Sequence, residues 1–336
     1  MKNFGLYLIV LLFLFAGCRI DDDYLSDYNK DELFTPVTTD EINAVKSDWE
    51  LRDLTPSDYE ELEIVELSDN QTILKLVSYR IDGLREYAAL LVPLEGSDLP
   101  VKVYLGGFGL GITENSVAIE SNQTAANKSI LAIPALRGQS LKITIEGKTY
   151  VTPTSEGIHC DAFDGAADDG IGLLNLIELT EKRANVNRTA VRGGSRGATV
   201  SLLMAERDNR VKMAFAIAGP TDLLGMTSIN ENDPTYQCQF LEDLVQNGGT
   251  IEEARKKMIA SSPLYFASDL PLAQLHLGEK DPIVPLSEGE KLQFEITRLG
   301  NQEHFELFIY EERGHVDISL KNELLNQRID SLMSQL

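Results

Sequence analysis

The chain has 336 residues, of which 43% are hydrophobic and 25% are charged, and its formal net charge at pH 7 is −23. These fractions are ordinary for a globular protein, and the length leaves room for one large domain. Because so negative a chain repels polyanions, the charge argues against nucleic acid as a partner and against a polyanionic substrate. We find neither a metal-ligand signature nor a dinucleotide-binding fingerprint, so we expect no cofactor.

The N-terminus is typical of a bacterial lipoprotein signal peptide. Lys2 is followed by an apolar run over residues 4–15, which is too short for a comfortable membrane span, and then by Ala16-Gly17-Cys18. This pattern predicts removal of residues 1–17 and lipidation of Cys18. A non-lipidated secretory signal and a retained anchor are the alternatives. We expect a protein of the bacterial cell envelope, held at the outer membrane through its lipid alone and exposed to the periplasm or the cell surface.

A polar, acidic stretch follows Cys18 and extends to about Asp40. Such a composition offers little apolar surface to bury, so we expect residues 18–44 to form a tether. Residues 45–336 then form the folded domain.

Apolar runs and helical periodicity indicate the elements of that domain. In the second half of the chain the two alternate, which predicts an α/β fold with a mostly parallel sheet, helices on both faces, and the early strands as an antiparallel edge. We expect strands at residues 61–67, 73–81, 86–92, 101–105, 129–134, 189–193, 213–218, 272–277 and 305–310, and helices at residues 164–182, 196–207, 287–299 and 322–335.

The alternation is interrupted after the strand at 213–218. Helical segments near 239–245 and 250–259 predict a small helical cap over about residues 220–262. Several apolar side chains there are candidates to line a substrate pocket, although most are expected to serve packing: Phe240, Leu241, Leu244, Tyr265 and Phe266.

The pentapeptide Gly193-Gly194-Ser195-Arg196-Gly197 has the form G-x-S-x-G, with an apolar run before it and a helix-compatible stretch after it. In this strand-turn-helix context the small residues permit a tight turn that exposes the serine hydroxyl. The pattern predicts Ser195 as the nucleophile of a serine hydrolase. An ordinary glycine turn is the alternative, so the prediction depends on a histidine and an acid in the right order.

Four histidines are available. His276 and His304 lie in expected strands and are interpreted as structural, and His159 precedes the serine in the chain. His315 follows the last strand, where loops hold catalytic groups in α/β folds. In the order nucleophile, acid, histidine, only His315 fits without rearrangement.

The acid is expected at Asp281, in the turn after the strand at 272–277. There it would hold the imidazole tautomer and stabilise the protonated ring. Asp222 is the alternative acid. Glu279 and Asp317 are expected to be solvated surface charges.

The oxyanion of the reaction needs two N–H donors. We expect one from the backbone of Arg196, just after the nucleophile, and the other from Gly107 in the glycine-rich loop 106–109. A simple glycine turn is the alternative for that loop.

Residues 193–219, residues 262–285 and Gly314-His315 together resemble the catalytic domain of prolyl oligopeptidase-type serine hydrolases. They also resemble, less closely, the acetyl xylan esterase and dienelactone hydrolase groups. The resemblance extends from about residue 63 to the C-terminus. It implies an α/β-hydrolase fold with an eight-stranded sheet, the cap inserted after the sixth strand, and a triad of Ser195, Asp281 and His315.

The chain departs from the prolyl oligopeptidases at Leu105, where the family has a tyrosine whose hydroxyl helps to bind the oxyanion. A hole made of backbone donors alone is common in esterases of the superfamily, which favours an ester substrate. We find no β-propeller ahead of the resembling region, which argues against the size-gated activity of the large oligopeptidases.

Further residues have structural interpretations. Arg137 matches an Arg-Gly motif that commonly braces active-site loops in these families, and Asp168-Asp169 suits the first turns of a helix. Cys160 and Cys238 form either a disulfide, as an oxidising compartment allows, or two buried thiols.

The sequence therefore predicts a serine hydrolase, foremost a carboxylesterase and among these a carbohydrate acetyl esterase. The alternatives are a prolyl oligopeptidase-type exopeptidase acting on short peptides and a catalytically inactive binding lipoprotein. The expected partner is a small ester or a short peptide.

Overall fold

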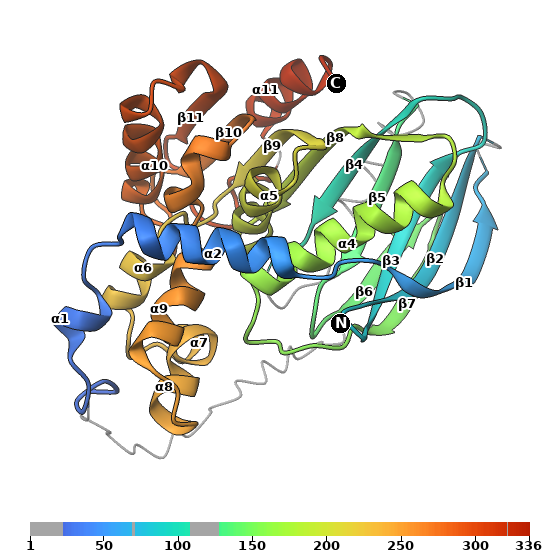
Figure 1. The fold of residues 1–336 in the computed structure, drawn as a ribbon. Helices are drawn as coiled ribbons and strands as arrows, with labels where there is room; N and C mark the ends of the chain where they lie inside the picture. Colours follow the sequence, from blue (N-terminus) through green and yellow to red (C-terminus); the bar gives the residue numbers. More distant parts are fainter. Residues whose placement is uncertain (1–22, 69–70, 108–127, 321) are drawn as a thin grey trace, which may run out of the picture.

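The computed structural model describes residues 23–68, 71–107, 128–320 and 322–336. Within them, one sheet has nine strands in the order β1-β2-β3-β5-β4-β8-β9-β10-β11 (Figure 1). In this order, the neighbours from β1 through β2 and β3 to β5 pair antiparallel. From β5 through β4, β8, β9 and β10 to β11, the neighbours pair parallel. Their bounds are β1 (Ser57–Glu66), β2 (Thr72–Ile81), β3 (Leu84–Pro93), β4 (Leu99–Leu105), β5 (Ile130–Ala135), β8 (Ala184–Gly194), β9 (Val211–Ile217), β10 (Leu272–Gly278) and β11 (Phe305–Tyr310).

These nine strands coincide with the nine apolar runs expected from the sequence, whereas the eight strands implied by the resemblance were one too few. The additional strand is β1 at the antiparallel edge, where most residues are exposed and five of the ten are acidic. Charged side chains on an edge strand oppose pairing with another chain, which explains how this edge can remain open to solvent.

A second sheet of two strands was not expected. It pairs β6 (Ser140–Ile145) with β7 (Lys148–Thr154). Its turn is Glu146-Gly147, both in the left-handed region with φ of 54° and 76°, as tight hairpins require. Leu141, Ile143 and Ile145 point to one side of the hairpin and pack on the face of the main sheet around β2, β3 and β5.

Helices cover both faces of the main sheet, as predicted. α4 (Asp164–Thr180), α5 (Arg196–Arg207) and α10 (Leu286–Arg298) contribute to the larger core on one face, and α11 (Glu323–Met333) packs on the other. Residues of β9 alternate between the two cores, with Ala214 and Ala216 in the first and Met213, Phe215 and Ile217 in the second.

Helical segments follow β9 where the insertion was expected. They are α6 (Leu223–Ile229), α7 (Pro234–Tyr236), a π-helical turn (Gln237–Leu241), α8 (Glu242–Gln246) and α9 (Ile251–Ala260). A disulfide joins Cys238 of this insertion to Cys160, before α4, with the two Cα atoms 5.3 Å apart. The Gln239 side chain accepts a hydrogen bond from the backbone of Ala162 at 2.9 Å. These contacts hold the insertion to the body of the domain.

The candidate pocket residues of the insertion serve packing. Phe240, Leu241 and Leu244 are buried in the main core. Phe266 is fully buried with its ring centroid 4.3 Å from that of Trp49, and Tyr265 donates its hydroxyl proton to Asp222 at 2.9 Å.

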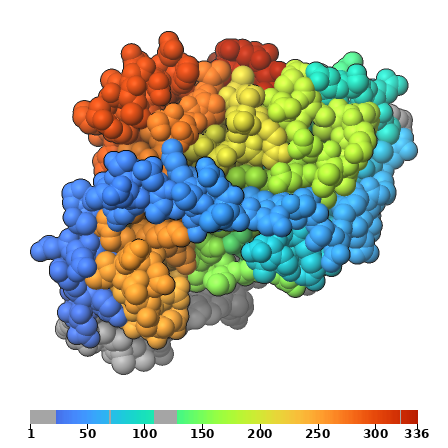
Figure 2. Space-filling view, viewed as in Figure 1, coloured from blue at the N-terminus to red at the C-terminus, as the bar shows by residue number. Residues whose placement is uncertain are grey.

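The described part of the expected tether, from Asp23 onward, is not an extended linker. It contains α1 (Lys30–Leu33) and α2 (Thr39–Leu51), and the side chains of Leu25 and Leu33 are fully buried. Figure 2 shows this blue segment lying across the molecule against the orange insertion. The signal peptide and Cys18 lie outside the described residues. No helix among those described is long and apolar enough to cross a membrane.

Polar contacts fasten this N-terminal segment at both ends. Arg255 of α9 donates to the carbonyls of Leu33 and Thr35 at 2.8 and 2.9 Å and to Glu41 at 2.7 Å. Towards α4, the indole of Trp49 donates to Asp164 at 2.8 Å. Residues 23–51 therefore bridge the insertion and the body of the domain (Figure 1).

Candidate active site

Ser195 occupies the turn between β8 and α5 in a strained conformation, with φ of 54° and ψ of −121°. Its N–H donates to the carbonyl of Ile217 at 2.8 Å, which fixes the turn to β9. A Cβ added at Gly193 would lie 2.1 Å from the carbonyl oxygen of Gly197, and one added at Gly197 would lie 2.3 Å from that of Leu105. The turn therefore admits only glycine at both flanking positions.

Three side chains from separate loops form one hydrogen-bonded chain. The Nε2 atom of His315 lies 2.8 Å from Ser195 Oγ, and its Nδ1 atom lies 2.8 Å from Asp281 Oδ2. The His315 side chain is 12% exposed, while that of Asp281 is completely buried. Since a carboxylate only accepts hydrogen bonds, Nδ1 of the neutral ring carries the proton and Nε2 accepts from the serine hydroxyl.

The Asp281 carboxylate is held by its own loop. Its Oδ1 atom accepts backbone hydrogen bonds from Ile283 at 2.8 Å and Val284 at 2.9 Å, which leaves Oδ2 for His315. Three hydrogen bonds therefore compensate for the burial of this charge.

The acid loop after β10 and the histidine loop after β11 are bonded to each other. Glu279 N–H donates to the carbonyl of Tyr310 at 3.0 Å, and Lys280 N–H donates to that of Arg313 at 2.8 Å. A Cβ added at Gly278 would lie 2.4 Å from the Arg313 carbonyl oxygen, so glycine permits this close approach.

Glu279 and Asp317 are exposed, as expected, and each also accepts a backbone hydrogen bond within these loops. Glu279 Oε2 accepts from Glu312 N–H at 3.1 Å, and Asp317 Oδ1 accepts from Gly314 N–H at 2.6 Å, next to His315. In the sequence, the closeness of these two residues to Asp281 and His315 indicates such a role.

Asp222, the alternative acid, is occupied elsewhere. It caps α6 by accepting from Gly225 N–H at 2.9 Å, accepts from the Tyr265 hydroxyl, and forms an ion pair with Lys291 at 2.7 Å. The structure therefore brings Asp281, and not Asp222, to His315.

The hydrogen-bonded chain contains His315 and not the other three histidines. His276 is buried in β10 beside Tyr310, with its Nδ1 atom 2.9 Å from the tyrosine oxygen, and burial lowers the pKa of His276 to about 3. His304, expected in a strand, instead ends a short 3₁₀ turn (Gln302–His304) ahead of β11. His159 is exposed in a loop.

Both expected oxyanion residues flank the serine. A Cβ added at Gly107 would lie 3.6 Å from Ser195 Cβ, so the end of β4 reaches the nucleophile. Arg196 begins α5, where backbone N–H groups of the first turn point out of the helix. Its side chain is buried and donates to Gln139 at 2.5 Å, and burial lowers the pKa of Arg196 to about 10. Phe108 and Gly109 of the expected loop lie outside the described residues.

Arg137 has a structural role, as the sequence suggested. It donates to both Asp169 oxygens from its backbone N–H and its guanidinium, with the shortest distances at 2.7 Å, and forms a further ion pair with Asp161. Asp168 pairs with Arg52 at 2.8 Å and with Arg207. The two neighbouring aspartates thus serve a buried network of ion pairs rather than simply occupying the start of a helix.

The described residues offer no ready metal site at this centre. One group of possible metal ligands comes together among them, Cys160, Cys238 and Glu242, and its two sulfur atoms are joined as a disulfide.

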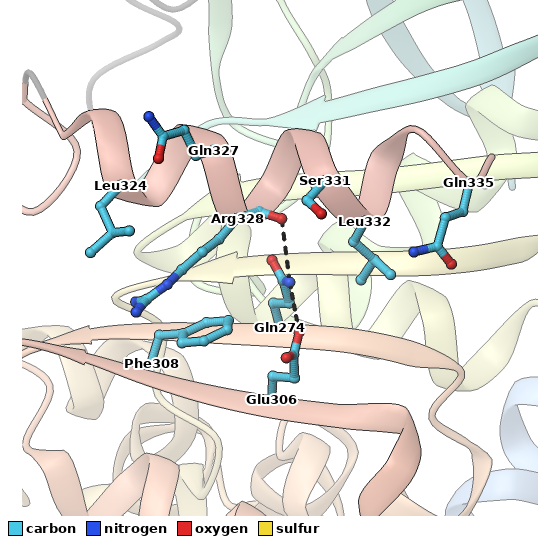
Figure 3. Close-up of a pocket in the computed structure, with 9 residues that line it drawn as sticks. All are labelled: Gln274, Glu306, Phe308, Leu324, Gln327, Arg328, Ser331, Leu332 and Gln335. Carbon is cyan, nitrogen blue, oxygen red and sulfur yellow. Dashed lines mark hydrogen bonds between the residues drawn. The ribbon is translucent and has the colours of Figure 1, made fainter.

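A cavity of about 390 Å³ lies between α11 and strands β10 and β11, away from the serine (Figure 3). Within it, Gln274 donates to Glu306 at 2.9 Å, and the guanidinium of Arg328 lies 4.0 Å from the centre of the Phe308 ring. None of the side chains of the hydrogen-bonded chain lines it, so it is not part of the candidate site.

Comparisons with known proteins agree with this fold. The acetyl xylan esterase 1 of a Thermoanaerobacterium species is 16% identical, with a TM-score of 0.67 over 89% of this chain and 94% of that one. An acetyl xylan esterase of a Paenibacillus species is 15% identical, with a TM-score of 0.63 over 91% and 98%. An acylaminoacyl peptidase of Pyrococcus horikoshii is 15% identical, with a TM-score of 0.57 over 79% and 41%.

No curated protein sequence matches the chain. The sequence profile of the prolyl oligopeptidase family matches residues 172–333, which include the serine, the acid and the histidine. The chain is therefore a serine hydrolase with the α/β-hydrolase fold, and its residues 172–333 are similar to the prolyl oligopeptidase family.

Proposed function

We propose that the protein is a carboxylesterase in which Ser195, His315 and Asp281 form the catalytic triad. The observation that carries this proposal is the pair of 2.8 Å hydrogen bonds that link the serine, the imidazole and the carboxylate. Ser195 Oγ attacks the carbonyl carbon of the ester while His315 Nε2 takes the hydroxyl proton, and Asp281 stabilises the imidazolium that forms.

The remaining steps follow from the same three groups. The tetrahedral intermediate collapses to an acyl-serine, and His315 returns its proton to the departing alkoxide. A water molecule then attacks the acyl carbon as His315 accepts one of its protons. The second tetrahedral intermediate collapses, His315 returns that proton to Ser195 Oγ, and the carboxylic acid product departs. We assign the stabilisation of both oxyanions to the backbone N–H groups of Gly107 and Arg196. One such donor contributes roughly 3–4 kcal/mol to the transition state.

Two observations favour an ester, with acetylated carbohydrate as the leading substrate class. Both acetyl xylan esterases align with about nine-tenths of this chain and with nearly all of their own. The acylaminoacyl peptidase, by contrast, is covered over 41% of its length. In addition, Leu105 carries no hydroxyl with which to assist a peptidase-type oxyanion hole.

We also propose that Cys18 is lipidated and anchors the enzyme in the outer membrane of a bacterial cell envelope. The disulfide between Cys160 and Cys238 supports export, because disulfides persist in oxidising compartments. Intact mass and detergent partitioning of the protein from a bacterial host test this anchor. A mature N-terminus other than a lipidated Cys18 would contradict it.

A substrate panel tests the activity. We expect p-nitrophenyl acetate and acetylated xylo-oligosaccharides to be hydrolysed, longer acyl esters to be turned over more slowly, and aminoacyl p-nitroanilides to be left intact. Ser195→Ala should abolish the activity, while Ser331→Ala, at an exposed serine of α11, should retain it. Faster cleavage of the anilides would instead identify an exopeptidase, and no turnover at all would favour the binding lipoprotein.

A further inference from the structure

A second cavity, of about 300 Å³, lies where the end of α2, the turn between β2 and β3, and the first half of α4 meet. None of the three proposed triad residues lines it. Asp53 and Asp82 are exposed at its mouth, whereas Glu86 and Asp169 are each only 1% exposed and mark its inner end. Its volume is at the lower limit of small-molecule sites.

Glu86 is the unusual residue of this cavity. Neither oxygen of its carboxyl group has a hydrogen-bond partner among the described residues. The Ser155 hydroxyl lies nearby but donates its proton to the carbonyl of Ala135 at 2.6 Å. A buried polar group without a partner is costly, so a carboxyl left in this state within a cavity calls for a ligand.

The surroundings of Glu86 keep it protonated. Burial first, and then repulsion by Asp169 and Glu156, raise the pKa of Glu86 to about 10, against the opposing effects of Arg137 and Ser155. Burial, and then the nearby Glu86 and Asp169, raise the pKa of the Tyr79 phenol as well. Near neutral pH the cavity therefore holds a neutral carboxylic acid.

The two guanidinium groups that line the cavity are already engaged. Arg137 donates to Asp169 and Asp161, and Arg52 donates to Asp48 and to Asp164 and Asp168 of α4. An anion would find no unused arginine there. Besides the neutral Glu86, the lining contains four aspartates against these two arginines, so its charge favours a cation: Asp53, Asp82, Asp168 and Asp169.

We propose that this cavity is a second binding site, for a small organic ammonium ion whose charged head pairs with Glu86 and whose hydrocarbon part lies against Leu54, Ile81 and Leu84. On binding, the Glu86 carboxylic acid loses its proton to the solvent and the carboxylate pairs with the incoming ammonium group. The ligand keeps its own proton, so each binding event releases one proton and breaks no other bond. The site is independent of the proposed esterase chemistry at Ser195.

Isothermal titration of the full protein with cyclohexylammonium chloride tests the proposal. We expect saturable binding with close to one proton released at pH 7, measured from two buffers of different ionisation enthalpy. Because the ionised fraction of Glu86 rises about tenfold per pH unit below its pKa, the affinity should rise about tenfold per unit from pH 7 to 9. Cyclohexanol, a neutral ligand of similar shape, should bind at least tenfold more weakly.

Variants complete the test. Glu86→Gln resembles the protonated carboxyl, so it should fold and lose binding at least tenfold, while Glu60→Gln, at an exposed position of β1, should bind as the parent protein does. Ser195→Ala should also bind normally, which separates this site from the proposed activity. Absence of binding, binding without proton release, or equal affinity in Glu86→Gln would each overturn the proposal. The number of protons released is measured on the parent protein, so this test does not depend on the stability of the variant.

Discussion

The imidazole Nε2 atom of His315 lies 2.8 Å from the hydroxyl oxygen of Ser195, although 120 residues separate the two in the chain. The parallel strands β8 and β11 end at the same edge of the sheet, and the loop after β11 reaches back past β10 to the serine. The hydrogen bonds between the acid and histidine loops hold His315 in this position.

Replacement of the two candidate acids should separate their roles. Asp281→Asn removes the acceptor that fixes the His315 tautomer, and we expect kcat to fall by about 10³- to 10⁴-fold with little change in KM. Asp222→Asn should keep kcat within a few-fold and lower stability by no more than about 1 kcal/mol, because it breaks the ion pair with Lys291 while an asparagine still caps α6. Steady-state kinetics and chemical denaturation of both variants check this, and a reversed pattern would identify Asp222 as the acid.

Leu105→Tyr should not create a better oxyanion hole. The Leu105 side chain is fully buried in the main core, so the larger ring would overpack that core instead of presenting its hydroxyl beside Ser195. We expect a loss of roughly 1–3 kcal/mol in the free energy of unfolding and no gain in kcat. Higher kcat on p-nitrophenyl acetate would show that the tyrosine of the prolyl oligopeptidases has a place here after all.

Arg255 should matter more for stability than its exposed neighbour. Only 5% of Arg255 is exposed, and its loss would remove the donor to three backbone carbonyls and to Oε1 of Glu41. We expect Arg255→Ala to lower the free energy of unfolding by about 3 kcal/mol. Lys256→Ala breaks a solvent-exposed pair with Asp48 and should cost less than about 1 kcal/mol. Equal losses in urea denaturation would mean that residues 23–51 are not fastened through Arg255.

Glu86 should make the protein less stable as the pH rises. Its folded pKa of about 10 lies above the unfolded value of about 4.3, so between these values the folded state holds a proton that the unfolded state has released. The unfolding free energy then falls with pH by up to about 1.4 kcal/mol per unit. Glu86→Gln should remove this slope and become progressively more stable than the parent protein from pH 6 to 8.

Comparison of the parent protein with Glu86→Gln also separates the effect of Glu86 from that of Glu206. Glu206 is another buried glutamate, and burial raises its pKa well above the usual range. Glu206 contributes equally to the pH dependence of the unfolding free energy in the parent protein and in Glu86→Gln. Its contribution therefore cancels when one curve is subtracted from the other. Parallel curves of unfolding free energy against pH would show that Glu86 is ionised in the folded state.

The sequence was most informative where the determinants of structure are local. Apolar runs marked all nine strands of the main sheet, and helical periodicity marked the four helices packed on it. The G-x-S-x-G turn and the chain order of acid and histidine singled out Ser195, Asp281 and His315, and the structure brings their side chains together. A strand pattern and a tight turn each depend on a few neighbouring residues, which is why they could be predicted.

Features that depend on distant partners could not be predicted. The segment 23–51 is too polar to indicate a packed element, and it is held by two buried leucines, Leu25 and Leu33, and by ion pairs whose partners lie more than a hundred residues away. The hairpin β6–β7, by contrast, has a local signal in the sequence, because Leu141, Ile143 and Ile145 alternate before the turn at Glu146-Gly147. The second cavity depends on three separate elements, and no pattern in the sequence indicates it.

Labelling with a fluorophosphonate probe tests the central claim most directly, because the probe reacts with an activated serine and not with an ordinary one. The purified protein should be labelled, and the label should disappear in Ser195→Ala but persist in Ser331→Ala. Folded protein that remains unlabelled, or label that persists in Ser195→Ala, would contradict the assignment of Ser195 as the nucleophile.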